Sequence, residues 1–148
     1  MKIYIGADHG GFHLRQLLID YLSKHYEVED DGNTLLDPDD DYPQFAAKVT
    51  ARMLSSDDKD PRGILVCKGA QGMSMAANRV KGIRAAVVWD NEEAKITRND
   101  NDSNVLCLSA RLFDDKAKSW QPVVNAWLNT PFSAAPRHMR RIKELDEI

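Results

Sequence analysis

The sequence lacks long apolar runs, is poor in cysteine and has no cluster of metal ligands. A membrane-spanning helix needs about 20 consecutive apolar residues, and no stretch approaches that length, so we expect no membrane partner. The two cysteines, Cys67 and Cys107, lie in apolar, strand-like runs and are expected to be reduced thiols. The four histidines are scattered and no Cys-x-x-Cys pair occurs, so we expect no metal.

An excess of positive charge and the usual nucleotide motifs are also missing. The net charge of −3 argues against non-specific binding of nucleic acid. Neither Gly10-Gly11 nor the turn at 69–72 has the Gly-x-Gly-x-x-Gly spacing, and no Gly-Lys-Ser/Thr occurs, so we expect no nucleotide binding. The first residues read directly as a strand, from which we expect no signal peptide and a cytoplasmic location.

Strand and helix patterns alternate along the 148 residues, a length that suits a single domain. Strands that alternate with helices predict an α/β fold whose parallel sheet is covered on both faces. The short apolar runs predict strands, and the runs with helical spacing predict helices, one of them with a possible kink at Pro122. The expected strands are 2–7, 26–30, 63–67, 83–88 and 104–108, and the expected helices are 12–25, 43–54, 72–80, 91–99, 114–128 and 137–148.

Cys67 ends a buried strand and is followed by a glycine-bearing turn, 68–72, and by a helix. The unpaired N–H groups and the positive dipole end of that helix favour a nearby anion and more thiolate. This arrangement predicts a base beside an anion cradle, for chemistry on a phosphorylated or enolisable small molecule. The competing interpretation is a cysteine packed as a small apolar side chain.

Asp8 and His9 follow the first strand, so they and Cys67 lie at carboxyl ends of parallel strands, where ligands bind in such sheets. Asp8 could orient His9, hold a sugar hydroxyl or cap a helix. His9 could act as an acid or donate to a phosphate. The acidic stretch 37–41 lacks the spacing of a calcium loop, and we interpret it as a solvated loop.

Arg137 and Arg141 stand four residues apart in the last helix and share one face, which would suit bidentate binding of a phosphate. Cations at a helix N-terminus oppose the helix dipole, so a bound anion would relieve them. We expect this helix, about 137–148, to reach toward a neighbouring subunit.

Seven motifs occur in order along nearly the whole chain: Gly6-Ala-Asp8-His9-Gly-Gly11, Asp41-Tyr42-Pro43, Cys67-x-Gly-x-x-Gly72, Ala76-Ala-Asn78, Gly82-Ile-Arg84-Ala, Asn101-Asp-x-Asn104-Val and Arg137-His-x-x-Arg141. In this combination the chain resembles the ribose-5-phosphate isomerase B and galactose-6-phosphate isomerase family. The resemblance implies a Rossmann-like three-layer α/β/α sandwich with a mainly parallel sheet of about five strands. It also implies no metal or cofactor, and a homodimer or dimer of dimers with active sites at the interface.

The family interconverts phosphorylated aldoses and ketoses through a cis-enediolate, and the resemblance implies a role for each matching residue. Cys67 would be the general base. The backbone of the following turn would stabilise the enediolate oxygens, with Lys68, Gly69, Ala70, Gln71 and Gly72 as its residues. The sugar would contact Asp8, His9, Tyr42 and Asn101. The phosphate would be held by Arg111, in the loop after the fifth strand and serving the partner's site, together with Arg137 and Arg141.

Two departures from the family pattern concern the substrate. Ribose-type members usually have His before the Asn-Asp-x-Asn segment, where it opens the furanose ring, and here that position is Asp100. An aspartate at its ordinary pKa is ionised near neutrality and is a poor acid. The turn reads Lys68-Gly69-Ala70 instead of Gly-Thr-Gly. We therefore expect a sugar phosphate other than ribose 5-phosphate. Three explanations are open: His9 opens the ring in place of the missing His, the substrate is already open-chain, or Asp100 binds a hydroxyl of a different sugar. The alternatives are a ribose-5-phosphate isomerase proper and a non-catalytic sugar-phosphate binder.

Overall fold

The protein is built on a five-stranded sheet in which every pairing is parallel, as the sequence predicts. The structure is a computed structural model and describes residues 1–114 and 119–148. The strand order is β2-β1-β3-β5-β4. The strands are β1 (Lys2–Ala7), β2 (Glu27–Asp30), β3 (Arg62–Cys67), β4 (Ala85–Val87) and β5 (Val105–Ser109).

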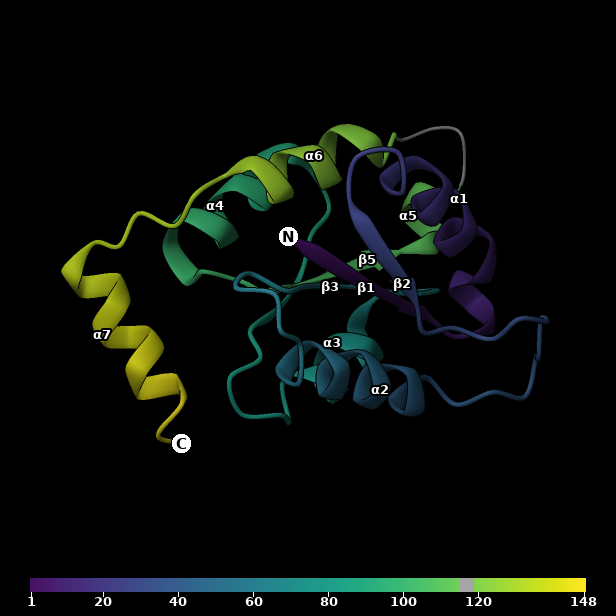
Figure 1. The fold of residues 1–148 in the computed structure, drawn as a ribbon, viewed down its shortest axis with the longest axis horizontal. Helices are drawn as coiled ribbons and strands as arrows, with labels where there is room; N and C mark the ends of the chain where they lie inside the picture. Colours follow the sequence, from purple (N-terminus) through teal and green to yellow (C-terminus); the bar gives the residue numbers. More distant parts are fainter. Residues whose placement is uncertain (115–118) are drawn as a thin grey trace.

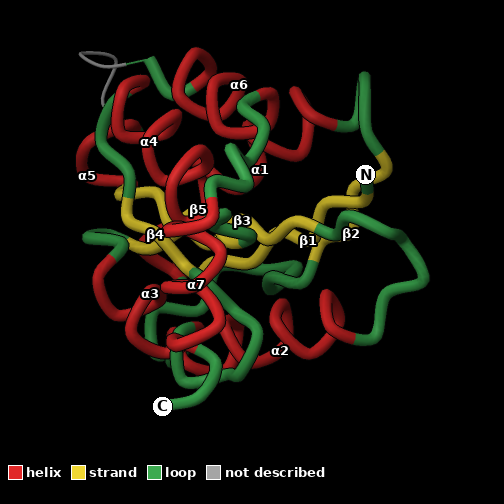
Figure 2. Tube along the Cα trace, turned by 90° about the vertical axis from the view of Figure 1, so that its left-hand side faces the viewer, coloured by secondary structure: helices red, strands yellow, loops and turns green. Residues whose placement is uncertain are grey.

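Helices cover both faces of the sheet and make the three layers that Figures 1 and 2 show. They are α1 (Phe12–Leu22), α2 (Tyr42–Leu54), α3 (Gln71–Ala77), α4 (Asn91–Asn101), α5 (Ala110–Phe113), α6 (Gln121–Asn129) and α7 (Pro136–Leu145), with a 3₁₀ turn at His9–Gly11. One apolar core joins the sheet to α1, α4, α5 and α6, and a second joins it to α2 and α3. None of the helices in the described ranges is long and apolar enough to span a bilayer.

The pattern of burial explains which strands are central. Nearly all of β1, β3 and β5 is buried, because helices cover both faces of the sheet at these strands. The edge strand β2 is only partly buried, and its Glu27 and Glu29 carboxylates lie 2.7 and 2.9 Å from the ammonium of Lys2 on β1. Charge on an edge strand also discourages pairing with another sheet.

The prediction of one kinked helix over 114–128 is wrong. Its residues 115–118 lie outside the described residues, and the chain on either side forms two separate helices, α5 and α6. Pro122 lies in the first turn of α6 and not at a kink, because a residue without an N–H is best tolerated where that N–H has no helical partner. Arg111 therefore lies in a short helix directly after β5 and not in a loop.

The topology fixes where a ligand binds. From β1 the chain continues to β2 at one side of the sheet, whereas from β3 it continues to β4 at the other side. The strand order therefore reverses between β1 and β3, and open α/β sheets bind ligands at such a switch point, beyond the carboxyl ends of the strands. Ala7 pairs with Val66, so Asp8 and Cys67 are in register across this point.

A close backbone contact holds the carboxyl ends of β1 and β3 together. A Cβ atom on Gly11 would lie 2.5 Å from the carbonyl oxygen of Val66, which belongs to the central strand and cannot move aside cheaply. On Gly69, by contrast, the nearest atom to an added Cβ would be 3.9 Å away, on Arg111. The first glycine is required by packing, and the second is not.

We therefore predict that Gly11→Ala destabilises the fold and that Gly69→Ala does not. Overpacking against a fixed backbone should lower the free energy of unfolding by about 3 kcal/mol in Gly11→Ala, and Gly69→Ala should change it by less than about 1 kcal/mol. Urea unfolding measures both. Equal midpoints for the two variants would contradict the close contact between β1 and β3.

Candidate active site at the carboxyl edge of the sheet

Cys67 is the thiol at the carboxyl edge of the sheet, by which we mean the residues that follow the ends of the strands. Its side chain is 6% exposed and packs in the second core beside Ala70 and Met73. The other thiol, Cys107, is fully buried on β5, and burial raises its pKa well above the usual range. Cys107 therefore stays protonated, and of the two thiols Cys67 is the one at the carboxyl edge.

The turn after Cys67 is held in place by the end of β5. The carbonyl of Lys68 accepts hydrogen bonds from the Ser109 hydroxyl at 2.9 Å and from the Arg111 N–H at 3.1 Å. Ala70 adopts a left-handed conformation, with φ of 65°, and starts α3. The Lys68 side chain is exposed. The turn thus brings Arg111 to the same edge as Cys67.

Tyr42 reaches this turn from the start of α2. Its ring carbons lie 2.8 to 3.1 Å from the position of a Cβ on Gly72, so the ring rests directly against that glycine. Tyr42 remains 40% exposed, which leaves part of the ring open to a ligand. Tyr42 therefore lies against the turn at 68–72, and its role in binding the sugar stays a prediction.

Asp8 caps the 3₁₀ turn that follows β1. Of the three roles considered for Asp8, these contacts match that of a helix cap. Its Oδ1 accepts the Gly11 N–H at 3.2 Å, and the side chain is buried. Burial raises the pKa of Asp8, while the neighbouring His9 opposes this shift. The prediction that Asp8 orients His9 finds no support in these hydrogen bonds.

His9 is instead oriented by Asp40, a residue that sequence reasoning missed. Asp40 Oδ1 lies 2.8 Å from His9 Nδ1 and accepts the His9 backbone N–H at 2.9 Å. The hydrogen bond to Asp40 raises the pKa of His9. The interpretation of 37–41 as a solvated loop is therefore wrong for Asp40, whose side chain is 7% exposed. Nothing in the sequence distinguishes Asp40 from its acidic neighbours Asp39 and Asp41, because the contact comes from the fold.

Four of the expected site residues lie at the opposite edge of the sheet. Asp100 and Asn101 end α4, just before β5 begins, and the exposed Arg137 and Arg141 lie on α7. In Figure 1, β1 runs from the N label toward the right of the view, whereas α7 lies at the far left. Within one subunit, these residues do not join Cys67.

Asp100 is engaged in contacts of its own. Its Oδ1 accepts the side-chain amide of Asn99 at 2.7 Å and lies 3.5 Å from Nδ1 of His138, the buried residue of α7. His13 and His25 are exposed, as predicted. In the described ranges, no group of three or more His, Cys, Asp or Glu side chains is arranged to hold a metal.

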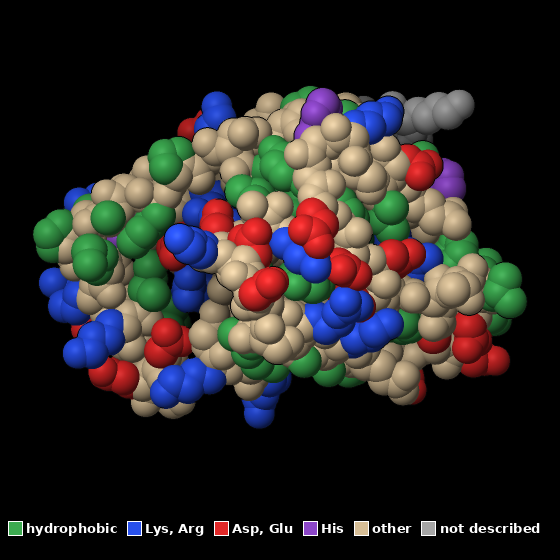
Figure 3. Space-filling view, viewed as in Figure 1, with side chains coloured by type: hydrophobic (Ala, Val, Ile, Leu, Met, Phe, Trp, Pro, Cys, Tyr) green, Lys and Arg blue, Asp and Glu red, His purple; other side chains and the backbone are tan. Residues whose placement is uncertain are grey.

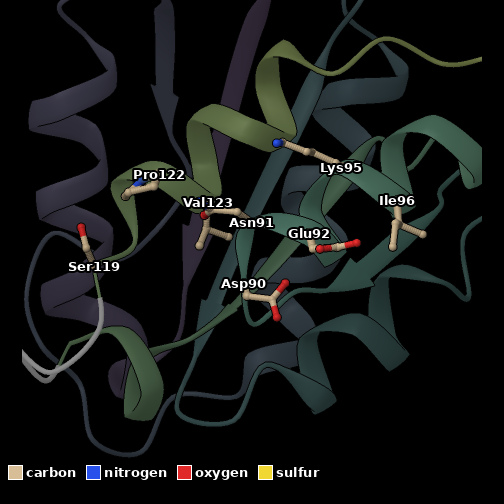
Figure 4. Close-up of a pocket in the computed structure, with 8 residues that line it drawn as sticks. All are labelled: Asp90, Asn91, Glu92, Lys95, Ile96, Ser119, Pro122 and Val123. Atoms are coloured by element: carbon tan, nitrogen blue, oxygen red, sulfur yellow. The ribbon is translucent and has the colours of Figure 1, made fainter.

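Cys67 lines none of the three pockets described below. The pocket in Figure 4 measures about 690 Å³ and lies at the start of α4 and α6. Asp90 and Glu92 line it, Asp90 is occupied in capping the Glu93 N–H at 2.8 Å, and these carboxylates would repel a phosphate. A groove of about 650 Å³ lies between the end of α7 and residues 78–86. Five aspartates are among the ten residues that line a third pocket, of about 420 Å³, beside the 31–41 loop.

The sequence and the fold are similar to those of known proteins. The family model described as Ribose/Galactose Isomerase matches residues 3–145. Ribose-5-phosphate isomerase B from Mycolicibacterium paratuberculosis is 36% identical over 148 residues, with 99% of this chain and 91% of the relative covered. The structure of ribose-5-phosphate isomerase B from Clostridium thermocellum superposes with a TM-score of 0.91 at 38% identity, covering 99% of this chain and 96% of that one.

A ligand complex is also among the similar structures. Ribose-5-phosphate isomerase B from Mycoplasma genitalium with bound ribulose 5-phosphate has a TM-score of 0.87 at 36% identity, covering 99% of this chain and 94% of that one. The predicted family and its Rossmann-like α/β/α fold are thereby confirmed. Since the match extends over nearly the full length of this chain and of its relatives, the protein belongs to the Ribose/Galactose Isomerase family.

Proposed function

We propose that this protein is an aldose–ketose isomerase that acts on a phosphorylated sugar and uses Cys67 as its general base. The observation that carries the proposal is the position of Cys67, which lies at the switch point of the sheet, in register with Asp8. The relatives support the class of reaction, because those compared above are ribose-5-phosphate isomerases B. No cofactor is part of the proposal.

The reaction moves one proton between neighbouring carbons. The Cys67 thiolate removes the proton from C2 of the open-chain aldose, the C–H electron pair forms the C1–C2 double bond, and the carbonyl electrons move to O1. The hydroxyl proton passes from O2 to O1, and Cys67 returns its proton to C1 to give the ketose. Backbone N–H groups of the turn 68–72 would stabilise the negative charge on the enediolate oxygens.

The remaining site residues would bind the two ends of the sugar. Asp8, His9 and Tyr42 lie at the carboxyl edge and would contact hydroxyl groups. Arg111 lies at the same edge, next to the turn, and would bind phosphate there. It need not serve a partner's site, because its guanidinium lies 3.9 Å from the Cβ position of Gly69 in the turn of its own subunit.

A second copy of the chain would supply the arginines that this subunit holds too far away. Arg137 and Arg141 are exposed on α7, beyond the other edge of the sheet. In Figure 3 basic side chains gather over α7 at the left of the view, with exposed apolar side chains beside them. On α7, Met139 and Leu145 are each 54% exposed. A dimer that covers α7 would bring these arginines, with Asn101, to the partner's Cys67 edge.

The substrate we favour is a sugar phosphate other than ribose 5-phosphate. Asp100 stands where ribose-type members have the ring-opening His, and Lys68 adds an ammonium beside Cys67. The names of the relatives favour the alternative of ribose 5-phosphate itself. A non-catalytic sugar-phosphate binder is the third candidate, and the presence of Cys67 argues against it because binding alone needs no base.

Cys67→Ala is predicted to abolish proton exchange, and Cys107→Ala to preserve it. The test measures deuterium uptake from D₂O at the carbon next to the carbonyl across a panel of aldose and ketose phosphates. Loss of the base should slow exchange at least about 100-fold. Cys107 is a matched control because it is also a buried cysteine of the second core, but away from the edge. Binding without exchange by the unaltered protein would favour the binder.

Ribose 5-phosphate is predicted to be a poor substrate relative to another member of the panel. The comparison is kcat/KM for ribose 5-phosphate against tetrose, other pentose and hexose phosphates, with a ribose-type isomerase measured in parallel. We expect at least one other sugar phosphate to exceed ribose 5-phosphate by about tenfold, since Lys68 and Asp100 change the groups that would meet the sugar. Turnover of ribose 5-phosphate that matches the ribose-type enzyme would overturn the substrate assignment and leave the isomerase assignment standing.

Two inactive variants are predicted to restore activity when they share a dimer. Cys67→Ala and Arg141→Ala each damage both sites of a homodimer, but a mixed dimer would contain one intact site if α7 crosses to the partner. Random association should then recover about a quarter of the unaltered activity, because half of the dimers are mixed and each has one working site of two. Absence of recovery after co-expression and verified subunit mixing would place Arg141 in the site of its own chain.

A further inference from the structure

The hydrogen bonds of His9 define a feature that the isomerase proposal does not use. One carboxylate oxygen, Oδ1 of Asp40, lies 2.8 Å from Nδ1 of His9 and accepts the His9 backbone N–H at 2.9 Å. The two contacts fix both the ring and the backbone of His9. The imidazole is 44% exposed while the carboxylate is only 7% exposed. A buried carboxylate therefore holds an imidazole that solvent and ligands can reach.

Asp40 is itself fixed in place by its own loop. Its second oxygen, Oδ2, accepts the side-chain amide of Asn33 at 3.2 Å, and its backbone N–H donates to the carbonyl of Asp37 at 3.3 Å. Both carboxylate oxygens are thus occupied. A carboxylate held in this way restricts its partner to one ring orientation, as an ordered second partner does for histidines at catalytic sites.

The orientation leaves the other ring nitrogen free for a ligand. Because Nδ1–H donates to Asp40, Nε2 is the nitrogen that an incoming molecule meets, and it has no hydrogen-bond partner among residues 1–114 and 119–148. The hydrogen bond to Asp40 raises the pKa of His9, and the nearby carboxylates of Asp8 and Asp37 add to this. Lys68 is a cation of the neighbouring turn, and its Cβ and backbone N lie against Gly10.

The position of His9 also matters because of what Asp100 does. Asp100 occupies the place of the family's ring-opening His, yet its carboxylate accepts from Asn99 and faces His138. His9, in contrast, lies beside Asp8 at the switch point, at the same edge as Cys67. We propose that Asp40 is a positioning residue that makes His9 the proton donor to the ring oxygen of a cyclic sugar phosphate.

The step balances without a cofactor, and it rests on the isomerase function proposed above. The C1–O bond of the ring breaks, its electron pair goes to the ring oxygen, and that oxygen takes the proton from Nε2 of His9. The C1 hydroxyl gives its proton to a solvent water molecule as the carbonyl forms. The neutral imidazole then regains a proton from solvent, which the carboxylate of Asp40 favours. The open-chain aldose is the form on which Cys67 acts.

The first test is Asp40→Asn, with Asp39→Asn as the matched control. Asparagine keeps an oxygen that can accept both bonds from His9, so the fold should remain while the charge is lost. Asp39 lies in the same loop, and its side chain makes no hydrogen bond with any described residue. NMR titration of the His9 ring should show its pKa falling toward the ordinary value of about 6.5 in Asp40→Asn and unchanged in Asp39→Asn.

The second test separates ring opening from proton transfer between carbons. Ribose 5-phosphate closes to a furanose, whereas erythrose 4-phosphate cannot, because its phosphate occupies the oxygen that would close the ring. At pH 7.5, Asp40→Asn should lower kcat/KM for ribose 5-phosphate about tenfold and that for erythrose 4-phosphate less than about twofold. The alkaline limb of the ribose 5-phosphate profile should move to lower pH, since the acid is lost as pH rises through the pKa of His9.

A double variant tests whether Asp40 affects ring opening only through His9. In a His9→Asn background, Asp40→Asn should cause no further loss with ribose 5-phosphate, because the residue acts only through His9. An additional loss there, an unchanged pKa of His9, or an equal loss with both sugars would overturn the proposal. Activity of the unaltered protein on erythrose 4-phosphate alone would overturn it as well. If the unaltered protein exchanges no proton with any sugar phosphate, the isomerase function fails first, and that result is distinct from all of these.

Discussion

The parallel pairing of β1 with β3 is the contact on which the candidate site depends. It aligns Ala7 with Val66, and so it sets Asp8 beside Cys67 at the point where the strand order reverses. Gly11 is required by the same contact, because only a residue without a side chain lets the turn after β1 approach the backbone of Val66. The separate hydrogen bonds of the Lys68 carbonyl then fix the turn after Cys67 to the end of β5. The packing of β1, β3 and β5 thereby sets the positions of the residues that follow each of these strands.

The sequence was sufficient for those parts of the site that follow from strand ends. Alternating periodicities predict the parallel sheet, and strands that end at Ala7 and Cys67 necessarily present the next residues at one edge. The sequence was not sufficient where tertiary contacts decide. Pro122 is compatible with both a kink and a first turn, and only the break between α5 and α6 selects the latter. Asp40 looks like its acidic neighbours until the fold brings the loop to His9.

In the proposed site, which takes the arginines of α7 as phosphate ligands, the distribution of charge over the two edges means that one subunit does not hold all the ligands. The carboxyl edge carries the base and several carboxylates, including Asp8 and Asp40, with Lys68 and Arg111 as its cations. A phosphorylated ligand brings further negative charge to this edge, and additional cations would favour its binding. The exposed arginines of α7 are such cations, but the fold holds them beyond the opposite edge. Association of two copies is the simplest way for a chain of this shape to bring the two together.

The two sides of the switch point are suited to opposite proton transfers. On the β1 side, burial raises the pKa of Asp8 and the hydrogen bond to Asp40 raises that of His9, so each group holds its proton more readily than it would in solvent. On the β3 side stands Cys67, a group that can take a proton from carbon once it is a thiolate. A donor and an acceptor on neighbouring strands are what ring opening followed by enolisation requires. Under the proposed mechanism, Asp100 is compatible with catalysis, because the acid comes from the strand next to the base.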